Sequence, residues 1–184
     1  MRDGRSVAYS LEKSFDCHFF KALCRWQSGA QEVIRFKLGY PEYYQSNCLL
    51  VRYEDLFNAP KDVLVKCFNF LGMDPSLYDY SYADKSKIIG SSDLRTTEAS
   101  VHWRPIQRTD AFNPLERYKN WSTWKQRTSE IILDKELNFF GYKTQAPTDS
   151  PKDILGKALY RLYQTSQIFS RNYLKKFVRR LVLG

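Results

Sequence analysis

The sequence has few of the residues that build metal sites and disulfide frameworks. Its 184 residues include four cysteines and two histidines. Cys17, Cys24, Cys48 and Cys67 show neither the paired spacing of a zinc site nor the density of a disulfide scaffold, so we expect buried free thiols and no metal. The chain also lacks an apolar run of membrane-spanning length, and its first residues do not form the charged, apolar and small-residue succession of a signal peptide.

The two histidines are also poorly placed for chemistry. His18 lies beside Phe19 in a predicted helix, and His102 is next to Trp103 and Arg104. Neither is at metal-ligand spacing, so packing or solvent exposure is favoured over catalysis.

Positive charge is concentrated at one end of the chain. The net charge is +9, and residues 149–184, with eight Lys or Arg and two Asp, contribute +6 of it. This distribution argues against a uniformly basic, specific nucleic-acid binder. A basic tail can instead bind polyanions or acidic membrane surfaces.

Hydrophobic periodicity predicts a helix near the start of the chain. Asp3 and Gly4 form a turn and a possible helix N-cap, and apolar residues follow at helical spacing as far as Trp26. The run 27–29, Gln-Ser-Gly, interrupts the pattern, and a second helix is expected over residues 31–38.

The next segment predicts a strand followed by a helix. Residues 48–53 are a short apolar run typical of a buried strand. Asn58 is expected to cap a helix that Pro60 begins and Gly72 ends. This order indicates an α/β fold with a parallel sheet flanked by helices.

Arg2 and Ser10 are the strongest candidate binding residues. Arginine offers a rigid fork of donors, and the serine hydroxyl adds one more. Arg2 precedes the first predicted helix and Ser10 lies within its first turns, and the N-terminus of a helix favours negative charge. Together they indicate a phosphate site.

The same residues resemble a family motif. Arg2-Asp3-Gly4-Arg5-Ser6-Val7 followed by Ser10 is similar to the 3′-phosphate-binding segment of sulfotransferases, Arg-Asp-Pro-Arg-x-Val-x-x-Ser, with Gly4 in place of the proline. The resemblance implies that Arg2 and Ser10 hold the 3′-phosphate of the sulfuryl donor, 3′-phosphoadenosine-5′-phosphosulfate (PAPS). Residues 89–95, Ile-Gly-Ser-Ser-Asp-Leu-Arg, resemble a Gly-Asn-x-x-Arg segment of that family, which makes Arg95 a third candidate donor ligand; a solvated arginine is the alternative.

Two further stretches match the family in order. The family has a strand that runs into Tyr-Glu-Asp-Leu, followed by Asn-Pro and then Phe-Leu-Gly. Similar residues occur here in the same order, at 51–56, at Pro60 and at 70–72. The tryptophan-anchored segment 121–142, ending in Phe-Gly-Tyr, resembles its closing helix. Glu54 and Asp55 are either an acid/base pair or acceptors for nearby backbone donors, and the second interpretation is favoured.

The family's loop for the 5′-phosphosulfate is not found. No Gly-rich Lys-Ser/Thr loop follows an apolar strand, and neither the catalytic lysine nor a base is identifiable. We therefore expect an N-terminally truncated sulfotransferase domain of P-loop-NTPase-like fold, inactive alone. A cytoplasmic location is favoured, although the missing part could include a signal anchor.

The predicted organisation is a domain over 1–142, a linker over 143–151 and a basic amphipathic helix over 152–184. The resemblance implies sulfuryl transfer from PAPS to a hydroxyl or amine. The motifs are more similar to those of carbohydrate or glycolipid sulfotransferases, which favours acceptors of that kind. The alternative function is a non-enzymatic basic module that binds membrane or protein through the helix over residues 153–183. For that helix, packing against its own domain is the other interpretation. A phosphate-loop kinase is disfavoured because no acidic metal-binding strand end is apparent.

Overall fold

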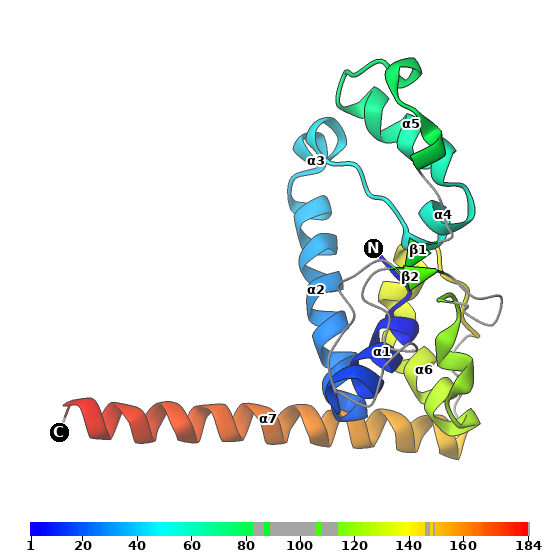
Figure 1. Cartoon of the computed structure of the whole chain (residues 1–184). Coiled ribbons are helices and arrows are strands. Elements are labelled where there is room, and N and C mark those ends of the chain that lie inside the picture. Colours follow the sequence, from blue (N-terminus) through cyan, green and yellow to red (C-terminus); the bar gives the residue numbers. More distant parts are fainter. Residues whose placement is uncertain (83–86, 89–105, 108–113, 146–147, 149, 184) are drawn as a thin grey trace.

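The described part of the chain is predominantly helical (Figure 1). The computed structural model describes residues 1–82, 87–88, 106–107, 114–145, 148 and 150–183, with side chains in the last helix described as far as Gln167. The α-helices are α1 (Gly4–Phe15), α2 (Phe19–Gly39), α3 (Pro41–Asn47), α4 (Tyr53–Asn58), α5 (Pro60–Phe70), α6 (Thr123–Phe139) and α7 (Pro151–Leu183). Short 3-10 turns are η1 (Pro75–Leu77), η2 (Tyr80–Tyr82) and η4 (Arg117–Asn120).

The predicted parallel sheet flanked by helices, and with it the P-loop-NTPase-like fold, is wrong for the described residues. Their strands are β1 (Lys87–Ile88) and β2 (Ile106–Gln107), which pair antiparallel. Residues 48–52 are extended but not assigned to a strand, and the Tyr-Glu-Asp-Leu stretch lies in α4.

One pair of hydrogen bonds explains why residues 48–53 resemble a strand. The Met1 ammonium donates to the Val51 carbonyl at 2.6 Å, and the Tyr53 N–H donates to the Met1 carbonyl at 2.6 Å. This is the pattern of a single parallel bridge, and no ladder extends it within the described chain. Leu49 and Leu50 are exposed, so the burial that stabilises an apolar strand is absent here.

The boundary between the first two helices also differs from the prediction. The chain breaks at Asp16, which is left-handed at φ 49° and ends α1, and α2 then runs without interruption through Gly29. Aspartate tolerates the left-handed region better than most residues. One interior glycine costs only about 1 kcal/mol, which does not end a helix that buries Trp26 and Ala30 on either side of it.

The hydrophobic core lies between α1, α2, α6 and the first half of α7. Leu23, Leu133 and Leu137 are fully buried there. Trp121 meets Tyr9 and Phe19 edge to face, with ring centroids 5.8 and 5.2 Å apart. The predicted tryptophan-anchored helix is thus confirmed as α6.

Residues 40–81, which we call the arm, extend from this core. Figure 1 shows α3, α4 and α5 at the end of the molecule away from α7. Within these three helices Val63 is the buried residue. Gly72, at φ 69°, follows the end of α5 as predicted, but the N-cap of α5 is Ala59 and not Asn58.

The helix predicted after the linker is present as α7, which begins at Pro151. A search of the described helices finds none with the length and apolarity needed to span a membrane.

Candidate anion-binding site

The backbone of Arg2 is fixed from three sides at the entrance to α1. The preceding residue, Met1, is hydrogen-bonded to Val51 and Tyr53. The following residue, Asp3, donates its N–H to Glu54 Oε1 at 3.0 Å, and the carbonyl of Arg2 itself accepts from the Trp26 indole at 3.0 Å. Arg2 is therefore held by segments that are far apart in the sequence.

The guanidinium of Arg2 retains donor capacity. Its Nη2 donates to the carbonyl of Pro114 at 2.5 Å, and its carbon lies 4.7 Å from the centre of the Tyr53 ring. Its Nε is buried and has no hydrogen-bond partner among the described residues. Unpaired buried donors are costly, so an acceptor at this atom would stabilise the site.

A second guanidinium adds positive charge. Burial lowers the pKa of Arg2, and the charge of Arg117 lowers it further, against the opposite influence of Tyr53, Glu54 and Asp3. Arg117 is itself buried in η4 and lies 5.4 Å from the centre of the Tyr9 ring. The two guanidinium groups therefore act on each other, and together they attract an anion.

The serines of the motif lie along α1. Ser6 is 1% exposed, and its hydroxyl has no hydrogen-bond partner in the described structure. Ser10 is one helical turn further on, partly buried, and lies on the same face of α1. No described contact joins Ser10 to Arg2. Arg95 lies outside the described residues.

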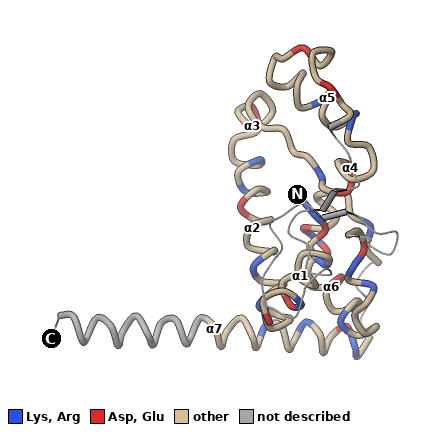
Figure 2. Tube along the Cα trace, in the orientation of Figure 1, with Lys and Arg blue, Asp and Glu red and all other residues tan. Residues whose placement is uncertain are grey.

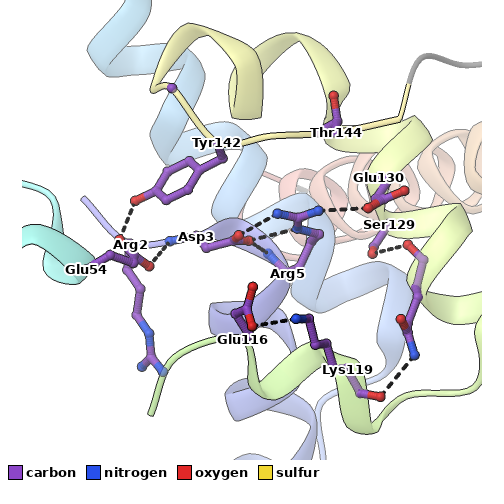
Figure 3. Close-up of polar contacts among 12 residues, drawn as sticks. Arg2, Asp3, Arg5, Glu54, Glu116, Lys119, Ser129, Glu130, Tyr142 and Thr144 are labelled. Carbon is purple, nitrogen blue, oxygen red and sulfur yellow. Dashed lines mark hydrogen bonds and ion pairs between the residues drawn. The ribbon is translucent and has the colours of Figure 1, made fainter. Parts of the chain in front are cut away.

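A buried ion network supports this end of α1 (Figure 3). Asp3 caps the helix by accepting from the Arg5 N–H at 2.8 Å, and its carboxylate also receives Nε and Nη2 of Arg5 at 3.1 and 2.7 Å. Arg5 Nη1 reaches Glu130 of α6 at 2.9 Å. The network joins α1 to α6, so the residue preceding the cap has a defined position.

Gly4 has a packing role in the same turn. A Cβ at this position would lie 2.5 Å from the Trp26 ring, so the indole packs directly on the backbone. This close approach explains why a residue without a side chain occupies the position where the sulfotransferase motif has proline.

Glu54 and Asp55 act as structural acceptors. The two oxygens of Glu54 accept from the Asp3 N–H and, at 2.7 Å, from the Tyr142 hydroxyl. Burial and this hydrogen bond raise the pKa of Tyr142. Asp55 lies 3.3 Å from Arg52 Nε. Glu54 is thus an acceptor, but its described donors are the distant Asp3 N–H and Tyr142 hydroxyl and not the backbone of the following turn, as the favoured interpretation had it.

The remaining polar candidates do not form a second site of this kind. His18 is exposed and stacks on Tyr163 with centroids 5.6 Å apart, as expected for a packing role, whereas His102 lies outside the described residues. The cysteines are free thiols, but only Cys17 is buried. The described residues contain no cluster of His, Cys, Asp or Glu that could hold a metal.

Sequence reasoning did not single out Ser6, whose buried hydroxyl lacks a described partner, or Arg117, whose charge acts on Arg2. Ser6 precedes Ser10 by one helical turn, whereas the sequence around Arg117 gives no signal. Comparison with known proteins adds no further candidates, because no family model, curated protein or solved structure matches the chain.

Proposed function

We propose that this chain carries the 3′-phosphate-binding residues of a PAPS-dependent sulfotransferase, which transfers a sulfuryl group to a hydroxyl or amine acceptor, preferably on a carbohydrate or glycolipid. The observation that carries the proposal is the buried, unpaired Nε of Arg2 beside the charge of Arg117. The proposal rests on this site and its motif and not on the fold.

The chemistry of the site suits a phosphate ester. A phosphate oxygen can accept from Arg2 Nε, and its negative charge offsets the repulsion between the two guanidinium groups. The Ser6 hydroxyl offers a further donor at the N-terminal end of α1, where the helix dipole also favours an anion. The adjacent Tyr53 ring keeps Arg2 in place through a cation–π contact.

Within the reaction these residues would bind and orient the donor. PAPS supplies the sulfuryl group, and transfer of such a group depends mainly on positioning and on stabilising charge. Arg2 and Ser6 would act at the nucleotide end, remote from the acceptor. The base that takes the acceptor proton and the residues around the 5′-phosphosulfate are not among those identified.

Titration calorimetry with the 184-residue chain tests the proposal. The ligands are 3′-phosphoadenosine-5′-phosphate and adenosine 5′-phosphate, which differ only in the 3′-phosphate. A charged hydrogen bond contributes about 1.5 to 3 kcal/mol, so Arg2→Gln should weaken binding of the bisphosphate about tenfold or more.

The control is Arg35→Gln. Arg35 is exposed on α2 and pairs only with Glu32, so its loss should leave nucleotide affinity unchanged. Equal affinity for the two nucleotides, the absence of binding by the wild-type chain, or an Arg2→Gln variant that binds as well as wild type would each show that the proposal is wrong.

A further inference from the structure

One face of α7 is fixed against the rest of the molecule. Asp153 is buried and accepts from Arg127 of α6 through Nε at 3.2 Å and Nη2 at 2.7 Å. One turn on, a Cβ at Gly156 would lie 3.1 Å from Thr128 Oγ1, so the two helices are in close contact there. Tyr160 is also buried, and its hydroxyl donates to Gln27 of α2 at 2.7 Å. The orientation of α7 about its own axis is thereby determined.

This orientation leaves an apolar stripe on the outside of α7. Leu155, Leu159 and Leu162 are 52%, 37% and 66% exposed, and their spacing of four and three residues places them on one face. In the sequence the same spacing continues with Phe169, Tyr173, Phe177 and Leu181. Apolar residues that are exposed on a surface facing only water are usually scattered singly, whereas Leu155, Leu159 and Leu162 lie together on one face.

The charge of α7 decides what can cover the stripe. From residue 151 to the end the chain has eight Lys or Arg and one acidic residue, Asp153, which is paired with Arg127. The basic residues of α7 whose side chains are described are Lys152, Lys157 and Arg161. Figure 2 shows Lys and Arg in blue along this part of the helix. Pairing with the α7 of a second copy would place many like charges together, whereas an anionic surface complements them.

We propose that α7 is a docking helix for an anionic lipid surface, with Leu155, Leu159 and Leu162 inserted at the interface and the lysines and arginines against the headgroups. A leucine face beside basic residues is the composition of helices that lie in the plane of a membrane. Leu155, Leu159 and Leu162 are exposed, and Figure 1 shows α7 along one edge of the molecule. This inference is independent of the proposed nucleotide site.

Vesicle co-sedimentation of the full chain tests the inference. The vesicles are phosphatidylcholine alone and phosphatidylcholine mixed with phosphatidylserine, each at low and high salt. We expect binding to the mixed vesicles that weakens as salt increases. The triple variant Leu155→Ser, Leu159→Ser, Leu162→Ser should bind about tenfold more weakly or worse, because the apolar part of the interaction is lost.

A matched variant controls for the loss of exposed leucines in general. Leu38, Leu71 and Leu77 are 69%, 65% and 85% exposed and lie away from α7, so their joint change to Ser should leave vesicle binding unchanged. Circular dichroism of both triple variants checks that each is folded. Because the substituted leucines are exposed in both, we expect native spectra.

Three results would overturn the inference. The first is a wild-type chain that does not bind the mixed vesicles at low salt. The second is equal loss of binding in the two triple variants. The third is a concentration-dependent dimer that only the α7 variant abolishes while its vesicle binding stays at the wild-type level; the stripe would then be an interface between copies of the chain.

Discussion

The helical core and the arm differ in what their apolar residues contact. In the core, α1, α2, α6 and α7 pack on one another, and their aromatic and aliphatic side chains share one buried cluster. In the arm, the main contacts of α5 are with its sequence neighbours α4 and η1. The difference shows that an amphipathic helix is buried only where a second element from elsewhere in the chain covers it.

Polar interactions follow the same division. The core joins distant segments by ion pairs such as that of Arg5 with Glu130. The arm is hydrogen-bonded to the core where it begins, at Val51, Tyr53 and Glu54. Further along the arm, the polar contacts of Asp74 and Asp79 are local, since each carboxylate accepts from the N–H two residues later. The core should therefore unfold as one cooperative unit, and the arm should contribute little to its free energy of unfolding.

The largest expected effect is the loss of a cation from the core. Arg5 is 4% exposed, and its change to Met leaves the buried carboxylate of Asp3 without its cation. Glu130, which is only partly buried, loses one of its two cations and keeps Arg127 at 3.7 Å. Removing one member of a buried ion pair costs about 3 to 5 kcal/mol of the free energy of unfolding. Urea denaturation followed by circular dichroism measures the cost.

Lys61 provides the matched substitution in the arm. Arg5 lies 4.2 Å from the centre of the Tyr118 ring, and Lys61 similarly lies 5.4 Å from that of Tyr80. Changing Lys61 to Met should cost at most about 1 kcal/mol, because an exposed cation–π contact is weak. If both variants lost the same stability, the arm would be part of the cooperative unit.

A smaller difference is expected from truncating leucine. Leu23 is fully buried in the core, so Leu23→Ala should lower the free energy of unfolding by about 2 to 5 kcal/mol. Leu77 in the arm is largely exposed, and Leu77→Ala should change it by less than about 0.5 kcal/mol. The same urea titration compares them. A large cost at Leu77 would indicate that the arm is covered in solution, for example by a second copy.

Sequence patterns predicted the helices of the core better than the arrangement of the arm. Helical spacing in α1, α5, α6 and α7 is a local property, so it was readable from the sequence. The break between α1 and α2 was predicted at Gly29 but lies at Asp16. The local sequence does not distinguish the two positions, because whether a residue ends a helix also depends on how that helix packs on its neighbours.

The predicted parallel sheet failed for a reason outside the local sequence. Residues 48–53 have the composition of a buried strand, but a strand needs a ladder of hydrogen bonds to a neighbouring strand, and the described chain provides only the single bridge to Met1. The anion site was partly predictable. Arg2 was identified from its position before a helix, whereas Arg117 is 115 residues away in sequence and reaches the site only through the packing of η4 on α1.

The smallest expected effect comes from comparing two glycines, Gly4 in the core and Gly39 at the border between the core and the arm. A methyl group at Gly4 would meet the Trp26 ring at 2.5 Å, so Gly4→Ala must displace the indole and should cost about 1 to 3 kcal/mol. At Gly39, the last residue of α2, a Cβ meets nothing within 4 Å, so Gly39→Ala should stabilise the protein by about 0.4 to 1 kcal/mol through the unfolded chain. Thermal unfolding measures the two changes in stability, which should have opposite signs.

Since the Trp26 indole also donates to the Arg2 carbonyl, Gly4→Ala should weaken nucleotide binding as well, which Gly39→Ala should not. Stabilisation by both substitutions would mean that Trp26 does not pack on Gly4 and that the entrance to α1 is less tightly held than the geometry indicates.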